Sequence, residues 1–325
     1  MPNVFINNKA VEVEEGSTVL DAALQVGVHV PTLCYFQGQS PLGACRVCTV
    51  EIEGAKSLMA ACATPVREGM RVFTNTKRVR EARKTVVQLL LSEHDGDCKY
   101  CDRADDCELK ELAYLFGVRE LPYEGEKPPA KPDRTTPALS RDPGKCIKCR
   151  RCVTACNAVQ NVGALFPQYR GYATQVAPAF AHDLATVPCV QCGQCAAVCP
   201  TSAITEVHHV PGVLNALEDP HQTVVVQTAP AIRAALGEEF GYPPGTLVTG
   251  KMVSALRELG FDRVFDTNFT ADLTILEEGS ELLDRLKRAL VDGEEVALPQ
   301  FTSCSPGWIK FAEHFYPDIL DHISS

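Results

Sequence analysis

The sequence predicts a multidomain α+β protein in which small cysteine-rich domains precede a unit of alternating strands and helices. The chain has 325 residues, enough for two to four compact units, and 45% of them are apolar, enough for real cores. Fifteen of the sixteen cysteines fall in close groups between positions 34 and 199. Beyond about residue 221 only Cys304 remains, and strand and helix patterns alternate. These observations predict metal–sulfur chemistry in the cysteine-rich part and the beginning of an α/β unit after it.

Composition and charge exclude several classes of protein. The formal net charge is −10 at pH 7, whereas a nucleic-acid-binding protein normally carries a basic stripe. The first residues lack a basic segment followed by an apolar one, and no run of about 18 apolar residues occurs, so the sequence predicts neither an export signal nor a membrane span. We therefore expect a cytoplasmic protein, in which so many cysteines indicate metal or redox sites and not disulfides.

Residues 1–77 are predicted to form one small mixed domain. Two short strands joined by an Asn-Asn turn come first, followed by a helix that Ser17 or Thr18 caps and Gly27 ends. Alternating apolar residues predict two further strands. The predicted elements are strands in VFIN (4–7), AVEVEE (10–15), RVCTVEIEG (46–54) and MRVFTNT (70–76), and a helix in TVLDAALQVG (18–27).

The first cysteine group follows C-x10-C-x2-C-x13-C and comprises Cys34, Cys45, Cys48 and Cys62. One closely spaced pair between two single cysteines suits a [2Fe–2S] cluster wrapped by a loop, although the spacing is not the plant-type one. A four-thiolate zinc site is the alternative, for which the two gaps are long. The pattern resembles the N-terminal ferredoxin-like domain of large multi-cluster dehydrogenases, and this resemblance implies a β-grasp fold.

Residues 78–121 are predicted to form a small helical domain with a second site. TKRVREARKTVVQLLLSE (76–93) has apolar residues at helical spacing and leads to a histidine, and a shorter helix is expected in CELKELAYLFG (107–117). The candidate ligands follow H-x3-C-x2-C-x5-C and are His94, Cys98, Cys101 and Cys107. Taken alone, they fit zinc as well as iron. Because the group lies between a predicted [2Fe–2S] site and a predicted pair of [4Fe–4S] sites, we expect a His-ligated [4Fe–4S] cluster that continues an electron path.

A proline-rich connection over residues 122–138 leads to an internal repeat within a domain over residues 139–208. GKCIKCRRCVTAC (144–156) and VPCVQCGQCAAVC (187–199) share C-x2-C-x2-C-x3-C, offset by 43 residues. In such a repeat three cysteines bind one cubane and the fourth crosses to the other, and two four-thiolate zinc sites are the alternative. The repeat resembles two-cluster bacterial ferredoxins. We expect two [4Fe–4S] clusters, one held by Cys146, Cys149, Cys152 and Cys199, the other by Cys156, Cys189, Cys192 and Cys195.

Residues 209–325 are predicted to begin an α/β unit. The predicted strands are VVVQTAP (224–230), RVFDTN (263–268) and VALPQF (296–301). The predicted helices are IRAALGEEF (232–240), MVSALRELG (252–260) and LLDRLKRALV (282–291). A unit that ends after about three strands would expose apolar edges, so we expect a fragment of a longer protein.

The order of the sites resembles two families, the large subunit of complex I with its formate dehydrogenase relatives, and the iron-only (FeFe) hydrogenases. Three segments favour the second family, because they resemble the opening of the hydrogenase catalytic domain: TAPAIRAALGEEFG (228–241), TGKMVSALRELGFDRVFDTNFTADL (249–273) and LPQFTSCSPGWIKFAEHFYP (298–317). FTSCSPGW (301–308) matches the first active-site motif of that family. The resemblance implies the N-terminal portion of a hydrogenase catalytic subunit of the multi-cluster, NAD(P)-linked type.

In that family this loop reaches the H-cluster, a [4Fe–4S] cubane joined through a cysteine to a two-iron centre that makes and splits dihydrogen. Alignment on Pro-Gly-Trp puts Cys304 at the proton-transfer position and Ser305 at the ligand position, and a one-residue rearrangement would make Cys304 the ligand. The resemblance therefore makes Cys304 the candidate catalytic residue. No cysteine follows it, so we expect one [2Fe–2S] and three [4Fe–4S] clusters in this chain, and an H-cluster only in a complete one.

These expectations leave two functions open. The first is the iron–sulfur electron-transfer portion of a hydrogenase, present as a fragment that lacks most H-cluster ligands and is inactive alone. The alternative is a non-catalytic multi-cluster electron-transfer subunit related to complex I or to NAD-linked formate dehydrogenase. No G-x-G-x-x-G motif occurs, so the expected partner is an electron donor or acceptor protein, either a ferredoxin or a flavin- or NAD(P)-binding hydrogenase subunit.

Overall fold

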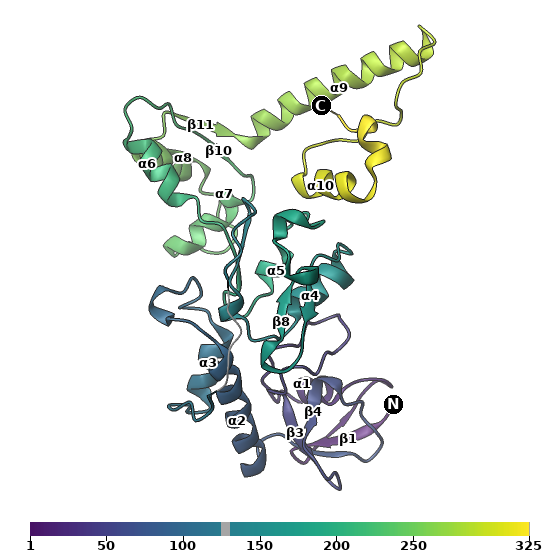
Figure 1. Ribbon diagram of the computed structural model, residues 1–325, viewed down its shortest axis with the longest axis vertical. Helices are drawn as coiled ribbons and strands as arrows, with labels where there is room; N and C mark the ends of the chain where they lie inside the picture. The colour runs from purple at the N-terminus through teal and green to yellow at the C-terminus, as the bar shows by residue number, and fades with distance from the viewer. Residues whose placement is uncertain (125–130, 325) are drawn as a thin grey trace. The chain divides into compact units, whose positions relative to one another are not determined.

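The computed structural model describes residues 1–124 and 131–324, which form two compact units, Met1–Val207 and His208–Ser325 (Figure 1). Part of the predicted proline-rich connection, residues 125–130, lies outside the described residues. The first unit contains all of the grouped cysteines, and the second contains Cys304. Each unit is therefore considered by itself.

A five-stranded mixed sheet begins the first unit. Its strands run in the order β2-β1-β5-β3-β4, with β1 parallel to β5 and the other pairs antiparallel. The strands are β1 (Asn3–Ile6), β2 (Lys9–Glu12), β3 (Thr49–Ile52), β4 (Met59–Ala60) and β5 (Arg71–Phe73). In the turn between β1 and β2, Asn7 and Asn8 have φ angles of 48° and 69°, which a two-residue hairpin turn requires. The four predicted strands are confirmed, and β4 is additional because two residues are too few to give a sequence pattern.

Helix α1 (Val19–Gln25) packs against this sheet and shares one apolar core with it. A capping box fixes its first turn, because Thr18 accepts a hydrogen bond from the backbone N–H of Asp21 and its own N–H donates to the Asp21 carboxylate at 2.8 Å. Two of the candidate metal ligands, Cys48 and Cys62, are buried in the same core. Burial of apolar area in this core therefore also holds the loops of the first cysteine group in place.

Two helices follow the sheet and lie side by side (Figure 1). They are α2 (Lys77–Glu93) and α3 (Glu108–Leu115). Thr76 caps α2 by accepting a hydrogen bond from the backbone N–H of Val79. Val87 of α2 is fully buried among apolar residues of α3 and of the cysteine loops before β3. Both predicted helices are confirmed, and α2 ends at His94 as expected.

The internal repeat is visible in the backbone. Lys148 and Gln191 are equivalent positions of the two copies and have φ angles of 58° and 55°, and the next equivalent pair, Arg150 and Gly193, has φ angles of 66° and 77°. Each copy then enters a one-turn helix. The elements of this domain are α4 (Arg151–Thr154), α5 (Gln194–Ala197) and two antiparallel strand pairs, β6 (Leu139–Arg141) with β9 (Ile204–Glu206) and β7 (Phe166–Gln168) with β8 (Gln175–Ala177).

The end of the proline-rich segment belongs to this repeat domain. Asp133 is 3% exposed, and its backbone pairs with that of Arg141. Its carboxylate accepts hydrogen bonds from the backbone N–H groups of Leu184 at 2.8 Å and Thr135 at 3.1 Å. The sequence predicted a connection up to residue 138, whereas residues from Asp133 onward pack on the domain because this carboxylate satisfies buried backbone donors.

The second unit begins an α/β arrangement in which β10 and β11 pair in parallel. Its elements are α6 (Val210–Glu218), β10 (Val225–Thr228), α7 (Ile232–Ala235), α8 (Thr249–Glu258), β11 (Arg263–Asp266), α9 (Thr267–Leu290) and α10 (Pro306–Phe315). The first two predicted strands and the three predicted helices are confirmed. Helix α9 begins at Thr267 and not at Leu282, because Asp266 caps it by accepting a hydrogen bond from the N–H of Asn268 at 2.9 Å.

The third predicted strand of this unit is wrong. Residues 296–301 form no strand, and among them only Phe301 makes a β-bridge, to Ile323. Pro299 has no N–H to donate to a strand ladder, which disfavours a place inside a sheet. The apolar residues of this segment therefore form a connection between α9 and α10.

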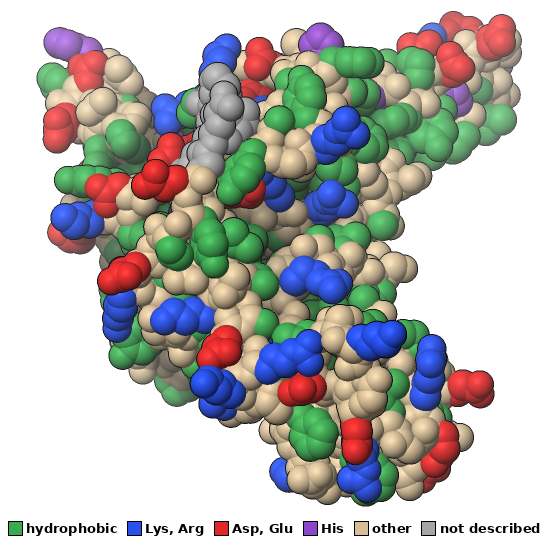
Figure 2. Space-filling model, turned by 60° about the horizontal axis from the view of Figure 1, so that its bottom comes forward, with side chains coloured by type: hydrophobic (Ala, Val, Ile, Leu, Met, Phe, Trp, Pro, Cys, Tyr) green, Lys and Arg blue, Asp and Glu red, His purple; other side chains and the backbone are tan. Residues whose placement is uncertain are grey.

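Charges of both signs are interspersed on the face that Figure 2 brings forward, with hydrophobic side chains between them. This agrees with the absence of a basic stripe in the sequence. Among the described residues, no helix has both the length and the apolar character that crossing a membrane requires.

Candidate metal centres

The structure brings the first cysteine group together beside the mixed sheet. All four thiols, those of Cys34, Cys45, Cys48 and Cys62, are buried. The sulfur atoms of Cys48 and Cys62 are 3.4 Å apart, and the backbone N–H of Cys45 lies 3.5 Å from the sulfur of Cys34. Two loops that are distant in sequence therefore present their sulfur atoms to one buried place.

Hydrogen bonds among these four thiols favour the thiolate form at Cys34 and Cys48. The Cys62 thiol lowers the pKa of Cys48 to about 7, although burial opposes the shift. Hydrogen bonds from Cys45 and Cys62 likewise lower the pKa of Cys34, and the pKa values of the two donors rise. Since the thiolate is the form that binds metal, these hydrogen bonds prepare two of the four side chains as ligands, and burial keeps all four away from solvent.

The second group lies where α2 ends and α3 begins. His94 is the C-terminal cap of α2, Cys107 is the N-terminal cap of α3, and the connecting loop carries Cys98 and Cys101. Burial raises the pKa of Cys107, and the charges of Cys101 and Cys98 raise it further, so the three thiols lie within electrostatic reach of one another. Cys98 is exposed, which makes this the most accessible of the N-terminal cysteine groups.

The imidazole of His94 has a defined orientation. Its Nδ1 lies 3.0 Å from the backbone oxygen of Lys145 in the repeat domain. A carbonyl oxygen only accepts hydrogen bonds, so Nδ1 carries the proton and Nε2 carries the lone pair that a metal would take. This is the usual outer-shell arrangement of a metal-ligating histidine.

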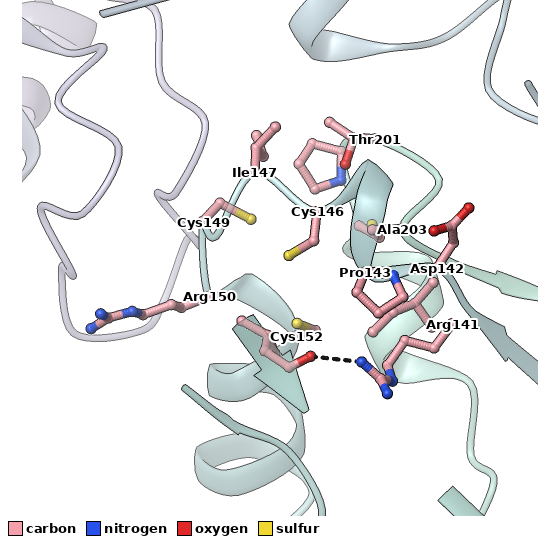
Figure 3. A pocket seen from close by; sticks show the side chains of 14 residues that line it. Arg141, Asp142, Pro143, Cys146, Ile147, Cys149, Arg150, Cys152, Thr201 and Ala203 are labelled. Atoms are coloured by element: carbon pink, nitrogen blue, oxygen red, sulfur yellow. Dashed lines mark hydrogen bonds between the residues drawn. The ribbon is translucent and has the colours of Figure 1, made fainter. Parts of the chain in front are cut away.

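The repeat domain contains a hollow lined by Cys146, Cys149, Cys152 and Cys199. It has about 400 Å³ of empty space, part of it open to solvent. Figure 3 shows the sulfur atoms of the three labelled cysteines facing this space, whereas Arg150 extends away from it. Arg141 lies at its edge and donates a hydrogen bond to the backbone oxygen of Val176 at 3.1 Å (Figure 3). The hollow thus combines three cysteines of the first copy with the last cysteine of the second.

A matching hollow is lined by Cys156, Cys189, Cys192 and Cys195. It has about 360 Å³ of empty space, again partly open to solvent. Here three cysteines come from the second copy and the fourth from the first. Each predicted set of four therefore surrounds its own hollow.

The chemistry of both hollows fits iron–sulfur clusters. Burial raises the pKa values of Cys149 and Cys195 to about 12, so cations are needed to draw these thiols into the thiolate form. In the part of the chain that the structure describes, no three His, Cys, Asp or Glu side chains are arranged to hold a single metal ion.

Two apolar clusters connect the four groups. One buries Cys34 and Cys45 of the first group together with Cys107 of the second and Cys149 of the repeat domain. The other contains Cys152 and, at its edge, cysteines of the second hollow. Cys149 belongs to the first cluster and Cys152 to the second, and both line the same hollow. Packed apolar side chains therefore connect that hollow to the first group, the second group and the second hollow.

Three arginines near the cysteines carried no recognised signal in the sequence: Arg83 and Arg141, which are buried, and Arg151, which is half-buried. Arg141 interacts electrostatically with Cys146, and Arg151 with Cys149. Arg83 does so with Cys48. The sequence offers a usable signal only for Arg83. It lies four residues after Val79 and four residues before Val87, so it interrupts the apolar face of α2.

Cys304 is exposed in the second unit, in the loop before α10. The loop is held by Glu278 of α9, whose carboxylate lies 3.3 Å from the backbone N–H of Ser303 and accepts a hydrogen bond from the hydroxyl of Ser324 at 2.7 Å. Ser305 is the N-terminal cap of α10. From the sequence, Glu278 is expected on a solvated helix face together with Glu277 and Glu281, whereas its carboxylate holds this loop.

Four families match successive parts of the chain. Residues 2–77 match the 2Fe-2S iron-sulfur cluster binding domain, and residues 83–122 match the NADH-ubiquinone oxidoreductase-G iron-sulfur binding region. Residues 145–204 match the 4Fe-4S dicluster domain. Residues 222–325 match the C-terminal domain of the iron only hydrogenase large subunit. The matched series has the order of sites that the cysteine spacings predicted.

Two hydrogenases and one solved structure illustrate what the chain is similar to. The chain is 52% identical to the NADP-reducing hydrogenase subunit HndD of Solidesulfovibrio fructosivorans, over 99% of this chain and 56% of that protein. It is 35% identical to iron hydrogenase 1 of Clostridium pasteurianum, over 100% of this chain and 56% of that protein. A crystal structure of an NAD+-reducing [NiFe]-hydrogenase in the H2-reduced state resembles 63% of this chain and 87% of its own, with a TM-score of 0.59 and 29% identity. The chain thus spans about half the length of the curated relatives it matches.

Proposed function

Because the chain belongs to the iron-only hydrogenase large-subunit family, as its electron-transfer part, we propose that it serves a hydrogen-converting centre. One [2Fe–2S] and three [4Fe–4S] clusters would accept and donate single electrons along the chain. The complete protein would oxidise dihydrogen or reduce protons. The match over residues 222–325 supports the hydrogenase assignment.

The proposed ligands are the sixteen side chains that the cysteine groups and His94 supply. A β-grasp domain over residues 1–77 would hold the [2Fe–2S] cluster, and residues 78–121 the His-ligated one. The repeat domain over residues 139–208 would hold two cubanes, and residues 209–325 would begin the catalytic domain. The observation that carries this proposal is that each hollow of the repeat domain is lined by three cysteines of one copy and one of the other.

The protein side chains would keep the sites dry and close together. Apolar side chains around Val87 and Leu109 fill the space between the first group, the second group and Cys149. Packed apolar surroundings exclude water and influence cluster potentials. Since Cys98 is exposed, we propose that an electron-carrying partner docks at the second group. The partner would be a ferredoxin or a flavin- or NAD(P)-binding hydrogenase subunit, in a cytoplasmic complex.

Cys304 would act in the complete protein, either moving protons or ligating iron at the H-cluster. Its thiol is exposed, and therefore accessible to other groups, in the part of the chain that the structure describes. In this proposal the carboxylate of Glu278 fixes the loop that carries Cys304, through Ser303 and Ser324.

A second candidate is a non-catalytic electron-transfer subunit, favoured by the match of residues 83–122 to the NADH-ubiquinone oxidoreductase-G region. Hydrogen evolution from reduced viologen separates the two functions. After maturation, we expect no turnover by the 325-residue chain and turnover by a chain that also carries the remaining H-cluster ligands. Turnover by neither would favour the electron-transfer subunit.

Metal content tests the cluster assignment separately. Anaerobically prepared chain should contain about 14 irons, the sum for one binuclear and three cubane clusters. A colourless preparation that contains zinc and little iron would refute the assignment.

A further inference from the structure

Arg83 occupies an unusual position on α2. The buried residues of this helix are Val79, Arg83 and Val87, which are four residues apart and form one stripe. The outer two are fully buried valines, and the middle one is a cation that is only 5% exposed. An apolar side chain would be expected there, because burying a charge without compensation is costly. The stripe therefore requires a nearby group that makes a cation favourable.

The contacts of Arg83 direct it toward the first cysteine group. Its Nε–H donates a hydrogen bond to the backbone oxygen of Thr49 at 3.1 Å, and Thr49 directly follows Cys48. One terminal nitrogen of the guanidinium is buried and has no hydrogen-bond partner. Burial lowers the pKa of Arg83 to about 10, and the charge of Cys48 opposes the shift, so the side chain stays a cation at neutral pH.

The other two arginines near cysteines, buried Arg141 and half-buried Arg151, have carboxylate partners. Arg151 forms two hydrogen bonds, of 2.6 and 2.8 Å, with the carboxylate of Glu108. Arg141 lies 3.9 Å from the carboxylate of Asp133. Among the ion pairs that the described residues form, none includes Arg83. Its positive charge is therefore balanced by no carboxylate in the described part of the chain.

An anion at the first cysteine group would supply this balance. Four thiolates around two iron ions and two sulfides carry a net negative charge, and a further electron adds to it. A fixed cation nearby stabilises the more negative state, which raises the reduction potential. Arg83 lies on α2, the helix that ends at His94 of the second cysteine group. The positive charge beside the first group is therefore supplied by the helical domain that carries the second group.

We propose that the fixed positive charge of Arg83 raises the reduction potential of the [2Fe–2S] cluster held by Cys34, Cys45, Cys48 and Cys62. The inference rests on the proposed function, since it requires that cluster. It adds a specific role for a residue outside the cysteine pattern: a charge that no carboxylate in the described residues offsets makes the [2Fe–2S] cluster easier to reduce than it would be without Arg83.

Potentiometric titration of the 325-residue chain, followed by the electron paramagnetic resonance signal of the reduced [2Fe–2S] cluster, tests the proposal. R83Q removes the charge and keeps a donor for the Thr49 oxygen, and R83M is a second neutral variant in case R83Q assembles poorly. R83K retains the charge. R78M is the matched control, because Arg78 is on the same helix, is exposed and has Glu51 at 3.6 Å.

At a fixed potential, R83Q and R83M should lower the ratio of reduced to oxidised [2Fe–2S] cluster at least tenfold, which corresponds to about 59 mV for a one-electron couple. R83K and R78M should each change it less than threefold. An equal ratio in wild type and the neutral variants, or an equal shift in R78M, would overturn the role of Arg83 while leaving the cluster assignment intact. A wild-type chain with no [2Fe–2S] signal would overturn both.

Discussion

Adding a single methyl group at Gly96 should disturb the candidate cluster that His94 would ligate. Gly96 lies two residues after His94, in the loop that leads to Cys98. A Cβ atom built on Gly96 would stand 2.9 Å from Nε2 of His94, the nitrogen that we propose as a ligand. Gly96→Ala therefore tests His94 without altering any ligand.

The size of the disturbance follows from this distance. Ordinary contacts of a Cβ atom begin near 3.4 Å, so the imidazole or the loop must move by about 0.5 Å. Metal–ligand distances tolerate only about 0.2 Å, so a ligating imidazole cannot absorb the shift. A comparable outer-shell disturbance weakens metal binding about 10- to 100-fold, or roughly 1.4 to 2.8 kcal/mol. If only the hydrogen bond to the Lys145 oxygen held the ring, the ring would rotate away at a cost of about 0.5–1.5 kcal/mol, with no effect on a cluster.

Iron analysis and electron paramagnetic resonance of anaerobic protein measure the outcome. We expect G96A to retain about ten irons of about 14, with loss of one [4Fe–4S] signal. Gly212→Ala is the matched control, since a Cβ there meets nothing within 4 Å, and it should keep the full content. Wild-type iron content and an unchanged spectrum in G96A would refute His94 as a ligand.

Four further outcomes are expected. His94→Cys adds a thiolate charge and should lower the midpoint potential of that cluster, and an unchanged potential would argue against ligation. Asp133→Ala leaves Arg141 buried without its carboxylate and should destabilise the repeat domain by about 3–5 kcal/mol, seen as cluster loss at lower denaturant concentration, while the exposed control Asp292→Ala should not. Burial raises the pKa of Asp133, but hydrogen bonds from Thr135 and Leu184 and the charge of Arg141 bring it below its ordinary 3.8. In cluster-free protein the ionised carboxylate should therefore contribute to the free energy of unfolding above pH 3.8, and this contribution should be lost as the pH drops below that value. Asp133→Ala should not show this loss. Cys304→Ala should leave the iron content at about 14, because Cys304 belongs to no proposed set, and a deficit of four irons would contradict that.

Spacing along the chain was enough to predict the candidate ligand sets and most of the elements that carry them. Closely spaced cysteines such as Cys146, Cys149 and Cys152 lie within one loop, so their spacing reports local geometry directly. Helix α2 could be predicted for a similar reason, because Thr76 and the apolar stripe act within a few residues of each other. Local signals of this kind need no knowledge of the rest of the chain.

Contacts between residues that are distant in sequence could be identified only in the folded structure. The bond from His94 to the oxygen of Lys145 spans 51 residues, and the bond from Arg83 to the oxygen of Thr49 spans 34. Residues 296–301 were predicted to be a strand and are not one. An apolar run becomes a strand only where a neighbouring strand offers its backbone groups, and the sequence of the run does not show whether such a neighbour exists. Which charge stands beside which thiol, and which apolar run finds a partner, depends on long-range packing, and spacing along the chain does not encode that packing locally.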